Sequence, residues 1–264
     1  MTDRIELPIS GATFGTDLSF VELVRRQRPE ALPPTAAGGG AIEMPHGTTV
    51  LGLRFADGIV MAGDRRATAG YLVADPKMQK VFAADDFSAI AIAGAAGQAV
   101  ETVRLFQLEL EHYEKLTGDR LSLEGKANRL AQMIRANFPL ALQGLVVVPL
   151  FGGFDEAKNE GRLFFYDATG GRWEEQDYQA TGSGAQSAKN SLKKTWRPGL
   201  DHATAVRVAV EALIDAAEDD VATGGPDLVR GILPNVLTVN AQGATEAGDE
   251  EVRGAVTAVL EARS

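Results

Sequence analysis

The feature that most constrains this sequence is an abrupt change of composition at Thr48. The residues before it hold five of the eleven prolines and a Gly-rich run, and only the amphipathic stretch 19–27 has the pattern of a helix. From Thr48 onward the residues turn β-branched and apolar, and 48–55 predicts a strand. Composition alone is typical of a tail before a folded domain, so we divide the chain into 1–47 and 48–264.

The overall composition narrows the classes of function. The 264 residues are 45% hydrophobic, which is enough for one sizeable core, and the formal net charge of −10 argues against nucleic acid or an anionic membrane as a partner. The chain has no cysteine, no run of about 18 apolar residues and no secretory signal. We therefore expect a cytoplasmic protein. We also expect neither metal nor cofactor, because no His/Cys cluster, phosphate loop or dinucleotide fingerprint occurs.

The predicted elements come in blocks of strands and blocks of helices. Strands are expected at 48–55, 59–62, 88–93, 146–151, 162–166 and 236–240, and helices at 94–116, 123–142, 182–195, 201–219 and 250–262. This order favours antiparallel sheets covered by layers of helices over a doubly wound parallel sheet.

Thr48 carries a possible chemistry of its own. A threonine hydroxyl needs a base to act as a nucleophile. If the chain is cut before Thr48, the new α-amino group has an ordinary pKa of about 7.7–8.0 and can take the hydroxyl proton, directly or through a water molecule. The three histidines, His46, His112 and His202, have no pattern of a catalytic triad around them. One residue would therefore supply both nucleophile and base.

Two charged residues could support that threonine. Asp64 follows the second strand of the predicted hairpin, which can bring it back beside Thr48, and Lys80 lies further along the chain. A buried lysine beside Asp64 would be held charged by the carboxylate and would lower the pKa of the Thr48 hydroxyl and amine. Taken singly, an aspartate and a lysine are more often surface residues.

The motifs around these residues resemble, in order and spacing, those of the β subunit of the 20S proteasome, most closely the actinobacterial type. The resemblance covers nearly all of 48–264, and although each motif alone is weak, their joint spacing is highly specific. The motifs are 47–50 (GTTV), 63–66 (GDRR), 77–80 (KMQK), 92–94 (IAG), 182–184 (GSG), 219–227 (DDVATGGPD) and 228–232 (LVRGI).

The resemblance implies an α+β fold, the four-layer αββα sandwich of two antiparallel sheets flanked by helices found in N-terminal nucleophile hydrolases. It assigns Thr48 as nucleophile and Asp64 and Lys80 as its charged support. Ser183 and Asp220 would complete the hydrogen bonds around the Thr48 amine. Two further assignments follow. Thr223 stands where the family often has a serine, and Gly94 would open a helix and offer its backbone N–H to the oxyanion.

The resemblance also implies a substrate site. Main-chain groups near Thr68 and Ala96 would pair with an extended peptide as an added strand. Ala67, Met78 and Ile92, with Ala96, would line the side-chain pocket. None of these is charged, so we expect a preference for apolar residues before the cut.

The implied activity is a threonine endopeptidase that first cuts its own Gly47–Thr48 bond, making 1–47 an autocleaved propeptide. The base for that first step is not identified, because the amine is then still acylated. The resemblance further implies seven such subunits in a ring, two stacked rings capped by α-subunit rings, an ATPase ring as regulator and tagged proteins as substrates.

Three other interpretations stay open at this point. A two-tier bacterial ATP-dependent peptidase shares the Thr-Thr start, but its chains are shorter and lack a long propeptide. A small-molecule amidase of the N-terminal nucleophile class would be separated by a peptide-substrate assay. A non-catalytic ring subunit is disfavoured by the intact set of Thr48, Asp64, Lys80 and Ser183.

Overall fold

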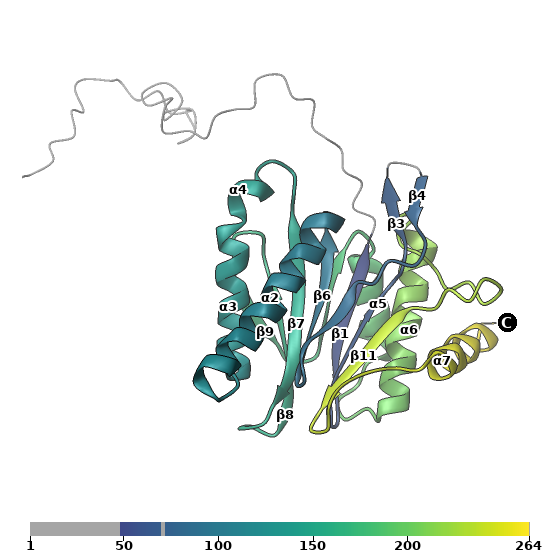
Figure 1. The fold of residues 1–264 in the computed structure, drawn as a ribbon. Coiled ribbons are helices and arrows are strands. Elements are labelled where there is room, and N and C mark those ends of the chain that lie inside the picture. The colour runs from purple at the N-terminus through teal and green to yellow at the C-terminus, as the bar shows by residue number, and fades with distance from the viewer. Residues whose placement is uncertain (1–47, 70–71, 264) are drawn as a thin grey trace, which may run out of the picture. The chain divides into compact units, whose positions relative to one another are not determined.

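The computed structural model describes residues 48–69 and 72–263 (Figure 1). The predicted helix at 19–27, Gly47 and His46 lie outside the described residues. Within the described part of the chain, no helix is long and apolar enough to cross a membrane.

One five-stranded sheet carries the start of the domain. Its strands all pair antiparallel in the order β10-β1-β2-β11-β12. Their bounds are β1 Thr49–Phe55, β2 Gly58–Gly63, β10 Tyr178–Gly182, β11 Asn235–Asn240 and β12 Gly243–Glu246. Along β1, Val50 belongs to one buried cluster and Leu51 and Leu53 to another, because successive side chains of a strand point to opposite faces. β1 is therefore a central strand that is buried on both faces.

The second five-stranded sheet is also antiparallel, in the order β5-β6-β7-β8-β9. Its strands are β5 Val81–Asp85, β6 Ser88–Gly94, β7 Val147–Asp155, β8 Glu160–Tyr166 and β9 Arg172–Glu175. A separate two-stranded hairpin, β3 Ala67–Ala69 with β4 Leu72–Asp75, lies outside both sheets. β3, β4, β5, β9, β10 and β12 were not predicted from the sequence, whereas the other six strands were.

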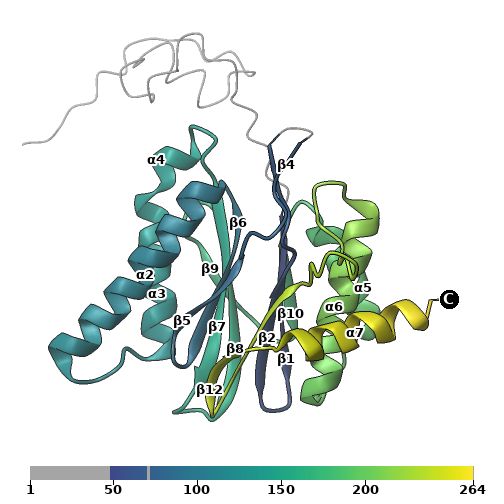
Figure 2. The same ribbon diagram turned by 45° about the vertical axis from the view of Figure 1, so that its right-hand side comes forward.

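Helices cover the outer face of each sheet (Figures 1 and 2). The helices are α2 Ala96–Thr117, α3 Leu123–Ala136, α4 Phe138–Ala141, α5 Ala185–Thr195, α6 His202–Asp219 and α7 Asp249–Glu261. Apolar side chains of α2 and α3 pack on the second sheet, and those of α5, α6 and α7 pack on the first. A third buried cluster lies between the two sheets. The predicted four-layer αββα sandwich is confirmed.

Two predicted helices start later in the chain than expected. Gly94 is the last residue of β6 and Gly182 the last residue of β10, and the helices begin at Ala96 and Ala185. Both glycines have a positive φ, of 123° and 105°, which non-glycine residues adopt only at a cost. Each glycine therefore turns the chain out of a sheet before the helix begins, and the prediction that Gly94 opens a helix is wrong.

The predicted helix 123–142 is two helices in the structure. α3 ends at Ala136, and the short α4 begins at Phe138 with Pro139 in its first turn. Proline has no N–H to donate, and inside a helix its ring would clash with the carbonyl four residues earlier, so α3 cannot continue through Pro139 and ends before Asn137.

Candidate active site

Thr48 lies at the start of the first sheet, directly before β1, and is 7% exposed. Its carbonyl accepts a hydrogen bond of 2.9 Å from the Ser183 backbone N–H, and its own nitrogen lies 3.4 Å from the Ser183 hydroxyl oxygen. A Cβ at Gly182 would come within 1.9 Å of the Thr48 carbonyl oxygen. Thr48 is therefore held against the end of β10 by a contact that leaves no room for a side chain at position 182.

Asp64 follows β2 and is 1% exposed. Its Oδ1 accepts hydrogen bonds from the Thr49 N–H at 2.8 Å and from Lys80 Nζ at 2.7 Å. Its Oδ2 accepts from the N–H groups of Arg66 and Gly224, both at 2.9 Å. Four donors thus satisfy this carboxylate, which is the condition for a charged group to be buried.

Lys80 precedes β5 and is 1% exposed. Besides Asp64, its Nζ donates to the Arg66 carbonyl oxygen at 2.6 Å. Burial lowers the pKa of Lys80 below its ordinary value, and the nearby Asp64 carboxylate opposes that shift without cancelling it. The pair predicted from the sequence is present and buried, but burial weakens the lysine's hold on its proton more than Asp64 strengthens it.

Ser183 and Thr223 meet at one carboxylate oxygen. Their hydroxyls donate to Oδ2 of Asp220 at 2.5 Å and 2.6 Å, and the Ala222 N–H donates to Oδ1 at 3.1 Å. Burial raises the pKa of Asp220, but the hydrogen bonds from Ser183 and Thr223 outweigh it, so the net pKa lies below the ordinary value. The structure therefore brings Thr48, Ser183, Asp220 and Thr223 into one connected group.

Gly94 is the last residue of β6. The Ile92 N–H donates to the Lys80 carbonyl oxygen at 2.9 Å, whereas the Ala95 N–H donates to Val146 on the other side. Because successive N–H groups of a strand point to opposite edges, the Gly94 N–H is directed to the side of Lys80.

The predicted substrate residues are less closely gathered. Ala67 and Thr68 are half-buried on β3, Met78 is half-buried in the loop before Lys80, and Ala96 is exposed at the start of α2. Ile92 is only 2% exposed and packs in the core beneath α2. Its side chain is therefore part of the core cluster on the α2 face of the sheet.

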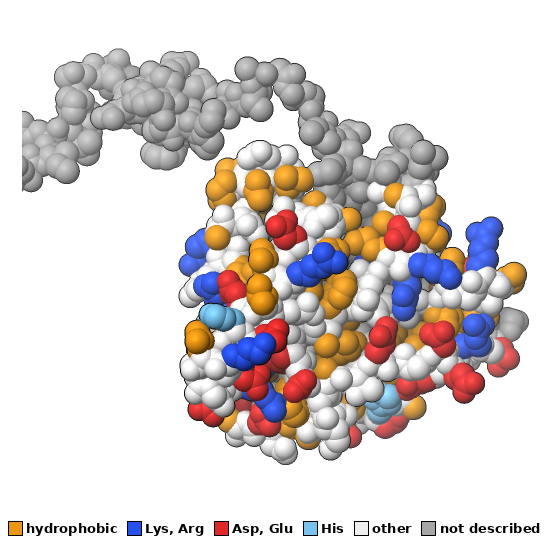
Figure 3. All heavy atoms as spheres, viewed as in Figure 1, with side chains coloured by type: hydrophobic (Ala, Val, Ile, Leu, Met, Phe, Trp, Pro, Cys, Tyr) orange, Lys and Arg blue, Asp and Glu red, His pale blue; other side chains and the backbone are white. Residues whose placement is uncertain are grey.

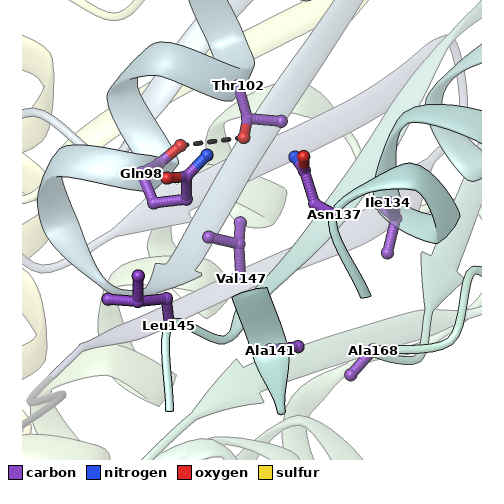
Figure 4. Close-up of a pocket in the computed structure, with 8 residues that line it drawn as sticks. All are labelled: Gln98, Thr102, Ile134, Asn137, Ala141, Leu145, Val147 and Ala168. Carbon is purple, nitrogen blue, oxygen red and sulfur yellow. Dashed lines mark hydrogen bonds between the residues drawn. The ribbon is translucent and has the colours of Figure 1, made fainter. Parts of the chain in front are cut away.

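A small cavity lies between the start of α2 and the junction of α3 and α4 (Figure 4). Its volume of about 10 Å³ is that of roughly one water molecule. It is lined by Gln98, Thr102, Ile134, Asn137, Ala141, Leu145, Val147 and Ala168, with no predicted site residue among them. This cavity is too small to receive a peptide side chain.

Thr49 is the participant that sequence reasoning missed. Its backbone N–H donates to Asp64, its hydroxyl lies 2.6 Å from that of Thr223, and it accepts the Gly184 N–H at 3.0 Å. The signal available in the sequence is the Thr-Thr doublet. As a β-branched residue the second threonine predicts a strand, and its pattern alone does not indicate a role for its hydroxyl.

The chain is similar to known proteins over most of its length. The sequence model of the family described as "Proteasome subunit" matches residues 44–229. A protein named "Proteasome subunit beta" from Acidimicrobium ferrooxidans is 53% identical over 93% of this chain and 90% of its own length. Proteins of the same name from Acidothermus cellulolyticus and Streptomyces griseus are 54% and 51% identical, over 93% and 97% of this chain and 87% and 92% of theirs.

Proposed function

We propose that this chain, which belongs to the proteasome subunit family, is a 20S proteasome β subunit that hydrolyses peptide bonds with Thr48 as its N-terminal nucleophile. The single observation that carries the proposal is the placement of Thr48 between two polar groups. On one side its neighbour Thr49 is bound to the buried Asp64–Lys80 pair, and on the other its nitrogen faces Ser183, which is bound to Asp220.

The proposed reaction uses the mature chain, in which 1–47 has been removed as a propeptide. The free amine of Thr48, with an ordinary pKa of about 7.7–8.0, is partly neutral near pH 7 and takes the hydroxyl proton. The hydroxyl oxygen attacks the scissile carbonyl, and the proton passes to the departing amine of the peptide. Water then hydrolyses the ester on Thr48 and restores the hydroxyl.

Two further groups serve the transition state. The positive charge of Lys80, held beside Asp64, favours the ionised Thr48 oxygen electrostatically. The Gly94 N–H, directed to the side of Lys80, donates to the oxyanion from the end of a strand rather than from a helix. Main-chain groups of Thr68 and Ala96 bind the substrate as an added strand, and Ala67 and Met78 line an apolar pocket beside them.

Self-cleavage precedes this activity. The Thr48 hydroxyl attacks the Gly47 carbonyl, and the bond to the Thr48 nitrogen breaks as that nitrogen takes up a proton, which frees the amine. Water then hydrolyses the resulting ester and frees the hydroxyl. Family membership means that the subunit assembles with other subunits into proteasome rings. We propose two stacked heptameric rings capped by α-subunit rings and served by an ATPase ring in the cytoplasm, so that the nucleophile acts on unfolded proteins inside a chamber.

The alternatives weighed from the sequence gain no support. Relatives that cover nearly the whole chain at 51–54% identity are each named proteasome β subunits. This favours the 20S assembly over a two-tier peptidase, a small-molecule amidase or an α-type ring subunit.

The test is to co-express the chain with an α subunit of the same organism and to determine the N-terminus and mass of the β subunit. The wild-type chain should begin at Thr48 and the complex should cleave peptides. Thr48→Ala should keep residues 1–47 and be inactive, and Thr48→Ser, which retains a hydroxyl, should be processed and active. An active complex whose β subunit still begins at Met1, or normal activity of Thr48→Ala, contradicts the mechanism.

A further inference from the structure

Thr49 is the first residue of β1 and is fully buried. Its hydroxyl oxygen lies between two partners that are remote in the sequence, the Gly184 N–H at 3.0 Å and the Thr223 hydroxyl at 2.6 Å. A Cβ at Gly184 would stand 2.5 Å from this oxygen and 2.9 Å from that of Thr223. The three groups are therefore packed too closely for any other side chain to enter.

The directions of these hydrogen bonds follow from counting hydrogens. Thr223 has one hydroxyl hydrogen, and it is donated to Asp220, a carboxylate that cannot donate when ionised. The hydrogen between the two threonines must then belong to Thr49. Thr49 can give it, because its own oxygen accepts from Gly184.

The same reasoning extends to Ser183. Its hydroxyl hydrogen is drawn to the Asp220 carboxylate at 2.5 Å rather than to the Thr48 carbonyl at 3.4 Å. The Ser183 oxygen is then left as an acceptor for the Thr48 nitrogen. The bonds run in one direction, from Gly184 through Thr49 and Thr223 to Asp220, where the bond from Ser183 also ends.

We propose that Thr49 is a positioning residue of the proteolytic site. Its hydroxyl holds Thr223, and through Thr223 the Asp220 carboxylate, in the place where Asp220 takes the Ser183 hydrogen and leaves the Ser183 oxygen an acceptor for the Thr48 nitrogen. The inference rests on the proposed function of Thr48. In the mature enzyme an amine hydrogen donated to Ser183 orients the amine, so that its lone pair is available to the Thr48 hydroxyl. Without the Thr49 hydroxyl, Thr223 loses a hydrogen bond that fixes its position beside Asp220, so the carboxylate that orients Ser183 is held less firmly and the loss is felt at Ser183.

The groups around Asp220 do not replace Thr49. The Lys80 charge acts on Asp220 without a hydrogen bond to it, because Lys80 Nζ donates to Asp64 and to the Arg66 carbonyl. The Arg66 guanidinium donates to the Val221 carbonyl at 3.0 Å. Among the described residues, the side-chain donors to Asp220 are thus Ser183 and Thr223, and Thr49 in turn donates to the Thr223 hydroxyl oxygen.

The test compares three variants in the assembled, processed complex. Thr49→Val keeps the shape but removes the hydroxyl, and we expect kcat for a fluorogenic peptide to fall about tenfold, the effect of one lost hydrogen bond, with KM unchanged. Thr49→Ala also lacks the hydroxyl and has a smaller side chain, and it should likewise lower kcat and leave KM unchanged. Thr49→Ser keeps the hydroxyl and should recover kcat to within about threefold.

A role in packing alone predicts a different pattern, in which Thr49→Ser is no better than Thr49→Ala. That result would overturn the proposal, and so would an unchanged kcat in Thr49→Val.

Thr223 supplies an independent arm of the test. Thr223→Val interrupts the same series of hydrogen bonds and should lower kcat with KM unchanged, and Thr223→Ser should recover kcat. If both residues act through one series of hydrogen bonds, Thr49→Val lowers the kcat of Thr223→Val by less than about a further twofold. Losses that multiply in full contradict a shared chain. Thr48→Ala separates the two hypotheses. An active Thr48→Ala contradicts the proposed function. An inactive Thr48→Ala together with a fully active Thr49→Val contradicts only the role inferred for Thr49.

Discussion

At the scale of single residues, the site depends on charges that are buried and fully bonded. Asp64 accepts four hydrogen bonds, from three backbone N–H groups and from Lys80. Those three N–H groups belong to Thr49, Arg66 and Gly224, so one carboxylate ties the start of β1 to the loop after α6. Asp64 therefore links backbone segments of the site in addition to pairing with Lys80. Removal of its carboxylate is expected to displace Thr48 as well as the lysine.

Replacement of Lys80 should lower both stability and catalysis. Lys80→Met leaves the buried Asp64 without its counter-charge, and breaking such a pair costs about 3–5 kcal/mol of unfolding free energy. Peptide hydrolysis should also fall by about 100-fold or more, in line with the loss of a preorganised charge. Chemical denaturation and steady-state kinetics of the assembled complex measure the two effects.

A matched control for this variant is Lys126→Met. Lys126 on α3 is also buried, with its Nζ 2.5 Å from Asp85, which is not one of the site residues. The control should lose stability to a similar degree and keep its kcat. If Lys126→Met and Lys80→Met lower kcat equally, Lys80 serves only the fold.

The lowered pKa of Lys80 predicts an alkaline limit to activity. The lysine is charged below its pKa, and burial places that pKa below the ordinary 10.5, so kcat should fall with rising pH before 10.5 is reached. The unfolded chain holds this proton to higher pH than the folded chain, so the lysine's contribution to stability rises with pH over the same interval. A kcat–pH profile recorded beside the unfolding free energy checks both signs. A kcat that stays level to pH 10.5 would contradict the prediction.

At the scale of elements, the residues of the site lie directly before or after strands rather than within them. Thr48 precedes β1, Asp64 follows β2, Lys80 precedes β5, and Ser183 follows β10. β1 pairs with both β2 and β10, so the hydrogen bonds of one sheet set the separation of three of these residues.

Gly182 at the end of β10 should be indispensable to that arrangement. Gly182→Ala meets two penalties at once, a φ of 105° and a Cβ only 1.9 Å from the Thr48 carbonyl oxygen. Because that oxygen belongs to Thr48, relief of the contact must move Thr48 itself, and we expect little processing and little peptide hydrolysis. Mass spectrometry of the β subunit checks the first expectation, and a peptide assay checks the second.

Gly199→Ala is the matched control for Gly182→Ala. Gly199 has a φ of 76°, but a Cβ there would meet nothing within 4 Å. It should cost about 1–2 kcal/mol of stability and leave processing intact. Equal loss of processing in both variants would mean that backbone strain, and not the contact with Thr48, explains the effect.

The sequence predicted the elements whose pattern is local. The β1–β2 hairpin follows from apolar strands around Asp57-Gly58, and the helix expected at 201–219 is α6, whose start Asp201 caps by accepting the Thr204 N–H. β5 and β10 were missed because neither has a regular alternation of buried and exposed residues. They become strands by pairing with β6 and β1.

The same division holds in the site. Asp64 was predicted because the hairpin can bring it back beside Thr48, and the role of Lys80 because the motifs around it resemble those of the family. The Thr49 hydroxyl was not, because its partners stand 135 and 174 positions away and become neighbours only in the folded sheet. The positive φ of Gly94 and Gly182 was likewise hidden, since a glycine at a strand end also fits a helix start.

At the scale of the whole molecule, one exposed apolar surface calls for a partner. Leu105, Leu108 and Leu116 of α2 are 47%, 60% and 72% exposed and recur at helical spacing. Figure 3 shows hydrophobic side chains gathered on the face where α2 lies. Single exposed leucines are ordinary, but a row of them marks an interaction surface. In a family that assembles into rings, we expect another subunit of the assembly to cover this row.

A charge in that row should impair assembly without unfolding the subunit. Leu108→Asp lies on an exposed face, so its effect on stability should stay within about 0.5 kcal/mol, while an aspartate buried at a subunit contact is strongly disfavoured. Native mass spectrometry after co-expression with the α subunit should show free subunits or half-assembled rings in place of the full complex. Leu260→Asp on α7, where a single leucine is 41% exposed, is the control and should assemble normally. Full assembly of Leu108→Asp would mean that the leucine row of α2 stays in solvent and that the contacts between subunits lie on other faces of the sandwich.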